Sequence, residues 1–174
     1  MRLMAEEQFN TDAYRVLGID PGLNITGYAA VEFFSSAEPV VLEAGTIRTD
    51  SKADMPRRID QIFTDLQEII AEIRPNVVAI EQLYSHYAHP RTSILMGHAR
   101  GVIMLAAAHA GILVHSVSAT RVKKSLTGNG HASKQQMQLA IQSLLSLENP
   151  PEPPDVADAL AIALCAGREV HLNV

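Results

Sequence analysis

The chain has 174 residues, of which 47% are hydrophobic and 19% charged, and its net charge at neutral pH is -5. This length suits one well-buried domain and is short for two. The single cysteine, Cys165, excludes a disulfide framework and a cysteine-based zinc site, which is typical of a cytoplasmic, reducing environment. No stretch approaches the roughly 18 uncharged apolar residues of a membrane span, so we expect no membrane partner. Residues 1–12 lack the apolar region of a signal peptide; we expect a flexible extension followed by a single domain over residues 13–170.

The first half of the chain predicts three strands and a helix. Residues 14–20, 25–34 and 40–48 are β-rich and separated by short turns, so they are expected to pair antiparallel. Pro56 opens a helix whose apolar residues recur at helical spacing, and Arg74-Pro75 ends it.

The second half predicts two more strands and several helices. Residues 77–81 form a fourth strand and 112–115 a fifth, with a helix between them that ends near Ala110. A short helix is expected over 118–126, another after the capping-box pair Ser133 and Gln136, and a last one after Pro153-Pro154. This order predicts an α/β fold: a mixed five-stranded sheet with its first three strands antiparallel, its first and fourth strands adjacent, and helices on both faces. Residues 101–108, GVIMLAAA, have no polar side, which indicates two apolar neighbours, one of which could be a second subunit.

Four carboxylates occupy positions that suggest a site. Asp20 and Glu81 each close an apolar strand, and Asp155 and Asp158 begin the last helix. The carboxyl edge of such a sheet is where α/β proteins hold ligands, and oxygen-only donors suit Mg²⁺ or Mn²⁺. The pattern predicts metal-dependent phosphoryl chemistry. Purely structural roles also exist: Asp20 as a turn residue, Asp155 as an N-cap, and Asp158 as an acid that complements the helix dipole.

The charge of the chain is unevenly distributed. Residues 82–147 contain no Asp or Glu, while they hold six of the seven histidines and six basic residues: Arg91, Arg100, Arg121, Lys123, Lys124 and Lys134. This favours a locally basic surface that binds nucleic acid, although solvated helix faces would give the same count. Three loosely spaced histidines, His86, His89 and His98, have no cysteine or carboxylate beside them, so zinc is not expected.

Five segments resemble one known family over residues 15–167: VLGIDPGLNITGYAAVE, VVAIEQLYS, GHARG, RVKKSLTGNGHASKQQ and PDVADALAIAL. They are similar to the RuvC-type Holliday-junction resolvases. The resemblance implies a ribonuclease-H-like fold, a homodimer, and symmetric endonucleolytic nicking of four-way DNA junctions in recombination and repair, leaving 5′-phosphates. It also implies a branch-migration helicase complex as a further partner.

The same resemblance assigns roles to individual residues. It implies that Asp20, Glu81, Asp155 and Asp158 are catalytic and bind two Mg²⁺ or Mn²⁺ ions, one activating a water and the other stabilising the leaving 3′-oxygen. Lys134 is implied as a further catalytic residue, and both Lys123 and Lys134 match lysines that the family places near the scissile phosphate and backbone. The implied DNA contacts are Tyr84, Arg91, Lys123, Lys124 and Lys134. The segment SHYAHPR is about one residue longer than the family pattern, which leaves the role of Arg91 open.

Two other readings compete with a nuclease. The segment GIDPGLNITG also resembles the first phosphate loop of actin-like and sugar-kinase-like proteins, but those need a second lobe for which this chain has no room. A junction-binding protein without catalysis would use the same scaffold, and retention of all four carboxylates argues against it. A cleavage assay with Mg²⁺ separates these possibilities.

Overall fold

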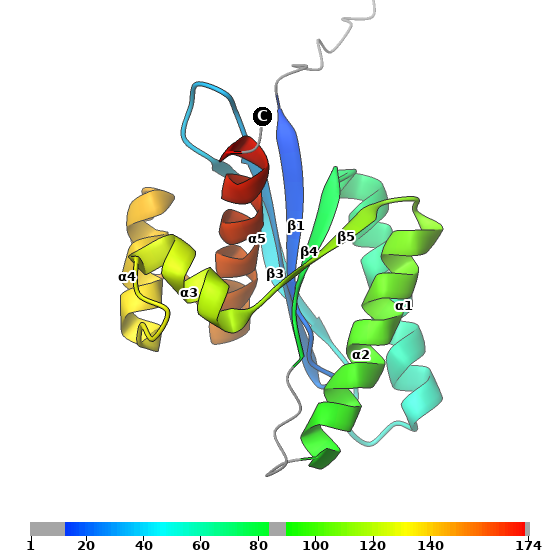
Figure 1. Cartoon of the computed structure of the whole chain (residues 1–174). Coiled ribbons are helices and arrows are strands. Elements are labelled where there is room, and N and C mark those ends of the chain that lie inside the picture. Colours follow the sequence, from blue (N-terminus) through cyan, green and yellow to red (C-terminus); the bar gives the residue numbers. More distant parts are fainter. Residues whose placement is uncertain (1–12, 84–89, 173–174) are drawn as a thin grey trace, which may run out of the picture.

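A mixed β-sheet forms the centre of the fold (Figure 1). The computed structural model describes residues 13–83 and 90–172. In that part of the chain five strands lie in the order β3-β2-β1-β4-β5. Their bounds are β1 Tyr14–Asp20, β2 Ile25–Phe33, β3 Val40–Arg48, β4 Val77–Glu81 and β5 Leu113–Val117.

The strand pairing follows from the connections. Short turns join β1, β2 and β3, which pair antiparallel, whereas helices precede β4 and β5, and β4 pairs parallel to both β1 and β5. The predicted mixed sheet is confirmed, including the adjacency of the first and fourth strands. The fifth strand differs from the prediction, because it continues to Val117, where it pairs with Glu81. A prediction based on apolar runs ends the strand too early because Ser116 is polar.

Helices cover both faces of the sheet, as predicted (Figure 1). The helices are α1 Met55–Ile73, α2 Pro90–His109, α3 Ala119–Thr127, α4 Lys134–Leu144 and α5 Pro154–Leu172. Alternate strand residues point to opposite faces, so Leu17 and Ile19 pack with α1 and α2, while Val16 packs on the side of α5. Two apolar cores, one on each face, therefore fix the sheet.

Local signals set the helix ends. The Asp54 side chain accepts from the Arg57 amide at the start of α1, and Arg74 ends that helix in the left-handed conformation. At α4 both halves of the predicted capping box form: Ser133 Oγ accepts from the Gln136 amide at 3.2 Å, and Gln136 Oε1 accepts from the Ser133 amide at 2.8 Å.

The last helix is the most deeply buried element. Every residue of α5 from Ala159 to Gly167 is buried, including Cys165, whose thiol has its pKa raised to about 11 chiefly by burial. That cysteine is therefore a core residue. Among the described residues no helix is long and apolar enough to span a lipid bilayer.

Candidate active site

Asp20 and Glu81 end neighbouring strands at the same edge of the sheet. Strands β1 and β4 run parallel, and their paired register ends at Ile19 and Ile80, one residue before each acid. Helix α5 begins at this edge with Pro154, so Asp155 and Asp158 start their helix beside the two strand ends (Figure 1). Sheet topology thus brings acids more than 130 positions apart in the sequence to one place.

Two glycines let α5 lie directly on the strands. Gly27 is the partner of Asp20 across β1 and β2, and a Cβ added there would overlap the Asp155 carbonyl. A Cβ on Gly18 would likewise overlap the Ala159 carbonyl. Because neither position tolerates a side chain, these glycines set how closely the acidic start of α5 approaches Asp20.

The four acids act on one another electrostatically. The pKa of Asp20 is raised to about 7, first by burial and then by the charges of Asp158, Glu81 and Asp155, while Lys134 opposes the shift. A carboxyl group in the company of other carboxylates resists ionisation in this way, because each added negative charge costs energy in a partly desolvated site. Asp20 is thus the acid on which the other three converge.

Glu81 and Asp158 show the same pattern. Burial and the charge of Asp158 raise the pKa of Glu81, and Lys123 lowers it. Asp158 is exposed to solvent as a residue, yet desolvation of its carboxyl group is still the largest cause that raises its pKa. Lys134 and Lys123 both act against that rise. The acids therefore share their site with two basic side chains.

A cavity of about 240 Å³ opens beside these acids. Its charged residues are Glu81, Asp158, Lys123 and Lys134. The rest of its lining comes from the three helices on this face: Ala119 and Val122 of α3, Met137, Gln138 and Ile141 of α4, and Pro154, Ala157, Ala161 and Ile162 of α5. Acids and lysines thus face a common space, as they must if both are to contact one phosphodiester.

The donor chemistry of the acids fits a hard divalent cation. All four supply carboxylate oxygens, the donors that Mg²⁺ and Mn²⁺ prefer, and a bound cation would relieve the carboxylate repulsion that helps to raise the pKa values of Asp20, Glu81 and Asp158. In residues 13–83 and 90–172 no three side chains of His, Cys, Asp or Glu are already gathered tightly enough to hold a metal ion. The match between these acids and a divalent cation therefore rests on the type of donor atom and on the charge of the site.

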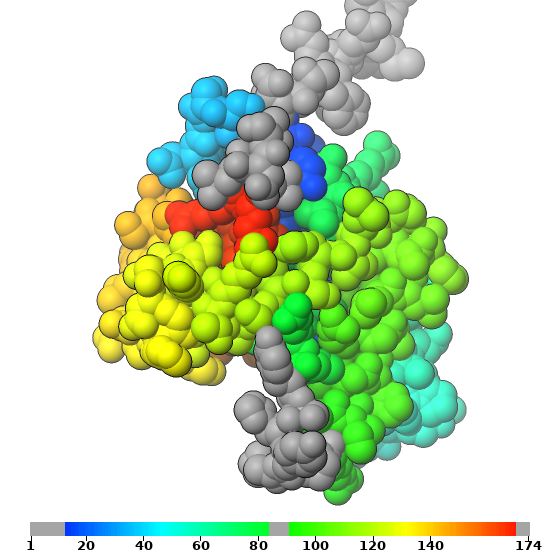
Figure 2. All heavy atoms as spheres, viewed as in Figure 1, coloured from blue at the N-terminus to red at the C-terminus, as the bar shows by residue number. Residues whose placement is uncertain are grey.

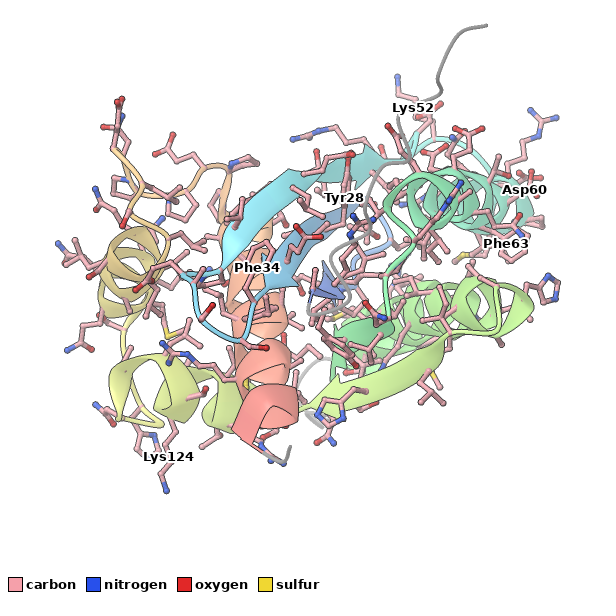
Figure 3. All side chains as sticks on the ribbon, turned by 90° about the horizontal axis from the view of Figure 1, so that it is seen from above. Tyr28, Phe34, Lys52, Asp60, Phe63 and Lys124 are labelled. Carbon is pink, nitrogen blue, oxygen red and sulfur yellow. The ribbon has the colours of Figure 1, made fainter. Side chains whose placement is uncertain are left out.

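The remaining predicted residues lie further out or cannot be placed. Lys123 lines the cavity, whereas the next residue, Lys124, is exposed and extends away from the protein (Figure 3). Arg91 is exposed in the first turn of α2. Tyr84 lies outside the described residues.

Two contributors to the site were missed by the sequence analysis. Gly27 was read as part of a strand, and Arg100 as one of several basic residues. The structure shows that Arg100 reaches the end of β4, where its Nε donates to the Glu81 carbonyl oxygen at 3.1 Å. The segment GHARG contains Arg100 and was the available signal, but a motif alone does not reveal what its arginine contacts.

The raised pKa of Asp20 makes a prediction about stability. In the unfolded chain Asp20 ionises near 3.8, and in the folded protein near 7, so folding disfavours its charged form. The resulting loss of stability is absent below about pH 4, grows between about pH 4 and 7, and is complete above that window. We expect Asp20→Asn to stabilise the metal-free protein by about 1 to 2 kcal/mol at about pH 8 and to have little effect near pH 4. Denaturant unfolding across pH measures both values.

Asp60→Asn is the matched control for this measurement. Asp60 is exposed on α1 (Figure 3), a helix that carries none of the four acids. The same exchange there should leave the pH dependence of unfolding unchanged. An Asp20→Asn curve that runs parallel to the wild type from about pH 4 to 8 would contradict the electrostatic account.

Comparison with known proteins identifies the family. The family model for "Crossover junction endodeoxyribonuclease RuvC" matches residues 16–166. The chain belongs to this family. A RuvC of Rhodopirellula baltica is 52% identical over 150 residues, covering 86% of this chain and 84% of that protein. A RuvC of Heliobacterium modesticaldum is 44% identical over 159 residues, covering 91% and 97%.

Solved RuvC structures have the same fold. The structure described as T. thermophilus RuvC in complex with Holliday junction substrate has a TM-score of 0.87 and 29% identity, covering 92% of this chain and 96% of that one. The yeast mitochondrial Holliday junction resolvase Ydc2 has a TM-score of 0.69 at 14% identity, which shows a shared fold. The ribonuclease-H-like architecture expected from the sequence is confirmed.

Proposed function

We propose that this chain is a structure-selective endonuclease that resolves four-way DNA junctions by metal-dependent phosphodiester hydrolysis. The observation that supports it best is the convergence of Asp20, Glu81, Asp155 and Asp158, three of which raise the pKa of the fourth, in a member of the RuvC family. A core-forming role does not explain three acids that disfavour the charged form of Asp20.

The four acids are proposed as the metal ligands. Two divalent ions, Mg²⁺ or Mn²⁺, would activate a water and stabilise charge on the leaving 3′-oxygen. The part played by the protein is to bring the four acids to one edge of the sheet, where the ends of β1 and β4 meet the glycine-spaced start of α5. The residues that precede Asp20 and Glu81 in their strands, Ile19 and Ile80, are fully buried and anchor these strand ends in the core.

The lysines are proposed to bind the DNA backbone at this site. Lys123 and Lys134 line the cavity beside Glu81 and Asp158, where an ammonium group would neutralise charge that develops on the scissile phosphate. Lys124 and Arg91 are exposed and remain predicted phosphate contacts. Tyr84 stays a prediction as the residue that reaches bases at the junction centre.

The substrate is proposed from the relatives. The T. thermophilus protein is described in complex with a Holliday junction substrate, and its fold superposes on nearly all of this chain. Since the two share 29% of their sequence, the same class of substrate is the simplest expectation here. A branch-migration helicase partner, a cytoplasmic location and a single nuclease domain over residues 13–170 also stay predictions.

A cleavage assay tests the function directly. Purified protein is incubated with a synthetic mobile four-way junction, with Mg²⁺, with Mn²⁺, or with EDTA. We expect paired nicks on opposed strands, with 5′-phosphate ends, when Mg²⁺ or Mn²⁺ is present and none in EDTA. Binding without any cutting would favour the non-catalytic alternative.

Lys134→Ala tests the proposed phosphate contact. If Lys134 meets a phosphate, its removal should weaken junction binding at low salt and reduce the slope of log affinity against log salt by about 1. Binding is measured without divalent metal, so that cutting does not interfere. The control is Lys52→Ala, because Lys52 lies far from Lys124 and the α3 side of the protein (Figure 3). A slope equal to that of the control would remove Lys134 from the DNA interface.

The chain is also proposed to act as a homodimer through α2. An exposed stripe runs along one side of this helix and is mainly apolar or small; we call it the α2 stripe. Its members are Ile94, Gly97, His98, Gly101, Met104, Leu105 and Ala108. Gly97 and Gly101 leave open space beside the helix, so a second helix can approach closely. In Figure 2 α2, in green, forms much of the right-hand surface. A two-fold axis through such a stripe would present two active sites to a symmetric junction.

A further inference from the structure

Arg100 is a basic residue whose side chain turns inward from α2. It belongs to the segment GHARG and is neither one of the proposed ligands nor part of the cavity lining. We propose that Arg100 is a positioning residue for Glu81: it holds the end of β4 so that the Glu81 carboxylate stays in place for metal binding. This inference rests on the proposed function, because it assumes that Glu81 binds the catalytic metal.

The guanidinium of Arg100 joins two strands. Its Nε donates to the Glu81 carbonyl oxygen at 3.1 Å, and its Nη2 donates to Ser116 Oγ at 2.7 Å. Its Nη1 contacts Met104 Sδ at 3.3 Å, one turn further along α2. A single planar group thus connects the last residue of β4, the neighbouring strand β5 and its own helix. Such a fork fixes orientation in a way that one hydrogen bond cannot.

The end of β4 needs this support because the sheet holds it on one side. The paired register between β1 and β4 stops at Ile80, so Glu81 has no partner in β1. On the other side Glu81 pairs with Val117 of β5, and the Gln82 amide donates to the Val117 carbonyl oxygen at 2.8 Å. Arg100 therefore adds a bond at a strand end where the ladder is incomplete.

Arg100 bonds to the backbone of Glu81, whereas other residues act on the charge of the Glu81 carboxylate. The charged groups that shift the pKa of the Glu81 carboxyl are Asp158, which raises it, and Lys123, which lowers it. Arg100 instead reaches the main-chain oxygen. Loss of Arg100 should consequently displace the carboxylate, which weakens metal binding, without removing a phosphate contact.

The test compares three variants in junction cleavage as a function of Mn²⁺ concentration. Arg100→Met removes every donor; we expect the cleavage rate at fixed metal to fall about 10- to 100-fold and the half-saturating Mn²⁺ concentration to rise about tenfold. Arg100→Lys retains a positively charged donor nitrogen but loses the planar fork, and it should recover part of the rate. Ser116→Ala removes one anchor of the guanidinium and should lower the rate about threefold in the same direction. Junction affinity without metal should stay within about twofold of the wild type in all three.

Arg15→Met is the matched control. Arg15 makes a similar bond, from its Nη1 to the Ile73 carbonyl oxygen at 2.9 Å, and it also pairs with Glu32, but it lies at the start of β1, the opposite end from Asp20. Its loss should lower the unfolding temperature and leave the half-saturating Mn²⁺ concentration unchanged. The proposal is overturned if Arg100→Met and Ser116→Ala keep the wild-type metal dependence, or if Arg15→Met shifts it equally. Absence of metal-dependent cutting by the wild type would instead reject the proposed function itself.

Discussion

We expect Asp20→Asn and Glu81→Gln each to lower the rate of junction cleavage by at least about 10³-fold while junction affinity stays within about threefold of the wild type. The amide side chains keep the size of the acids and remove the negative charge that a divalent cation requires. Metal-derived stabilisation of a transition state amounts to several kcal/mol, which corresponds to a rate factor of this size. Affinity should persist because the proposed phosphate contacts are lysines and arginines.

Single-turnover cleavage with excess protein measures the rate, and binding in Ca²⁺ or EDTA measures affinity. Asp60→Asn and Glu72→Gln, which alter exposed acids of α1, are matched controls and should cut like the wild type. Either active-site variant cutting within tenfold of the wild type would show that its acid is not a ligand. Equal losses of cutting and of binding would point to a folding defect, which unfolding curves would reveal.

The sequence predicted where the acids converge because the fold leaves few alternatives. An apolar run that ends in an acid places that acid at the carboxyl edge of a buried strand. The antiparallel turns make β3 run in the same direction as β1, and the crossover from β3 through α1 makes β4 parallel to β1. Asp20 and Glu81 therefore share an edge, and the last helix starts at that same edge (Figure 1). Strand order and the position of the acids are therefore consequences of topology, which hydrophobic pattern encodes well.

The contacts that finish the site depend on three-dimensional packing, which pattern does not encode. Gly27 carries no sequence mark that separates it from any strand glycine, and its role becomes visible through the Asp155 carbonyl that it faces. Arg100 counted as one of several basic residues, although its guanidinium turns inward to the Glu81 carbonyl and Ser116. The sequence showed that Arg100 is positively charged, but the direction in which its long side chain points depends on the residues packed around it.

The second large effect concerns the α2 stripe and the pairing of cuts. We expect Leu105→Glu to convert the protein from a dimer to a monomer at micromolar concentration. Leu105 is 49% exposed in the single chain, and the exchange would place an unpaired charge from each protomer into a dry interface, at a cost of several kcal/mol. Several kcal/mol corresponds to a dissociation constant raised on the order of 10²- to 10³-fold. Sedimentation equilibrium measures this change.

Loss of the dimer should alter cleavage in a particular way. A dimer places two sites on opposed strands of one junction, whereas a monomer cuts each strand as a separate event, so paired nicks on a single junction should become rare even where single nicks persist. Leu139→Glu is the control, because Leu139 is a 54% exposed leucine on α4, outside the stripe, and this variant should sediment as a dimer. If Leu105→Glu remained dimeric, or if the wild type were itself monomeric, the α2 stripe would not be the interface, and symmetric resolution would require a different surface.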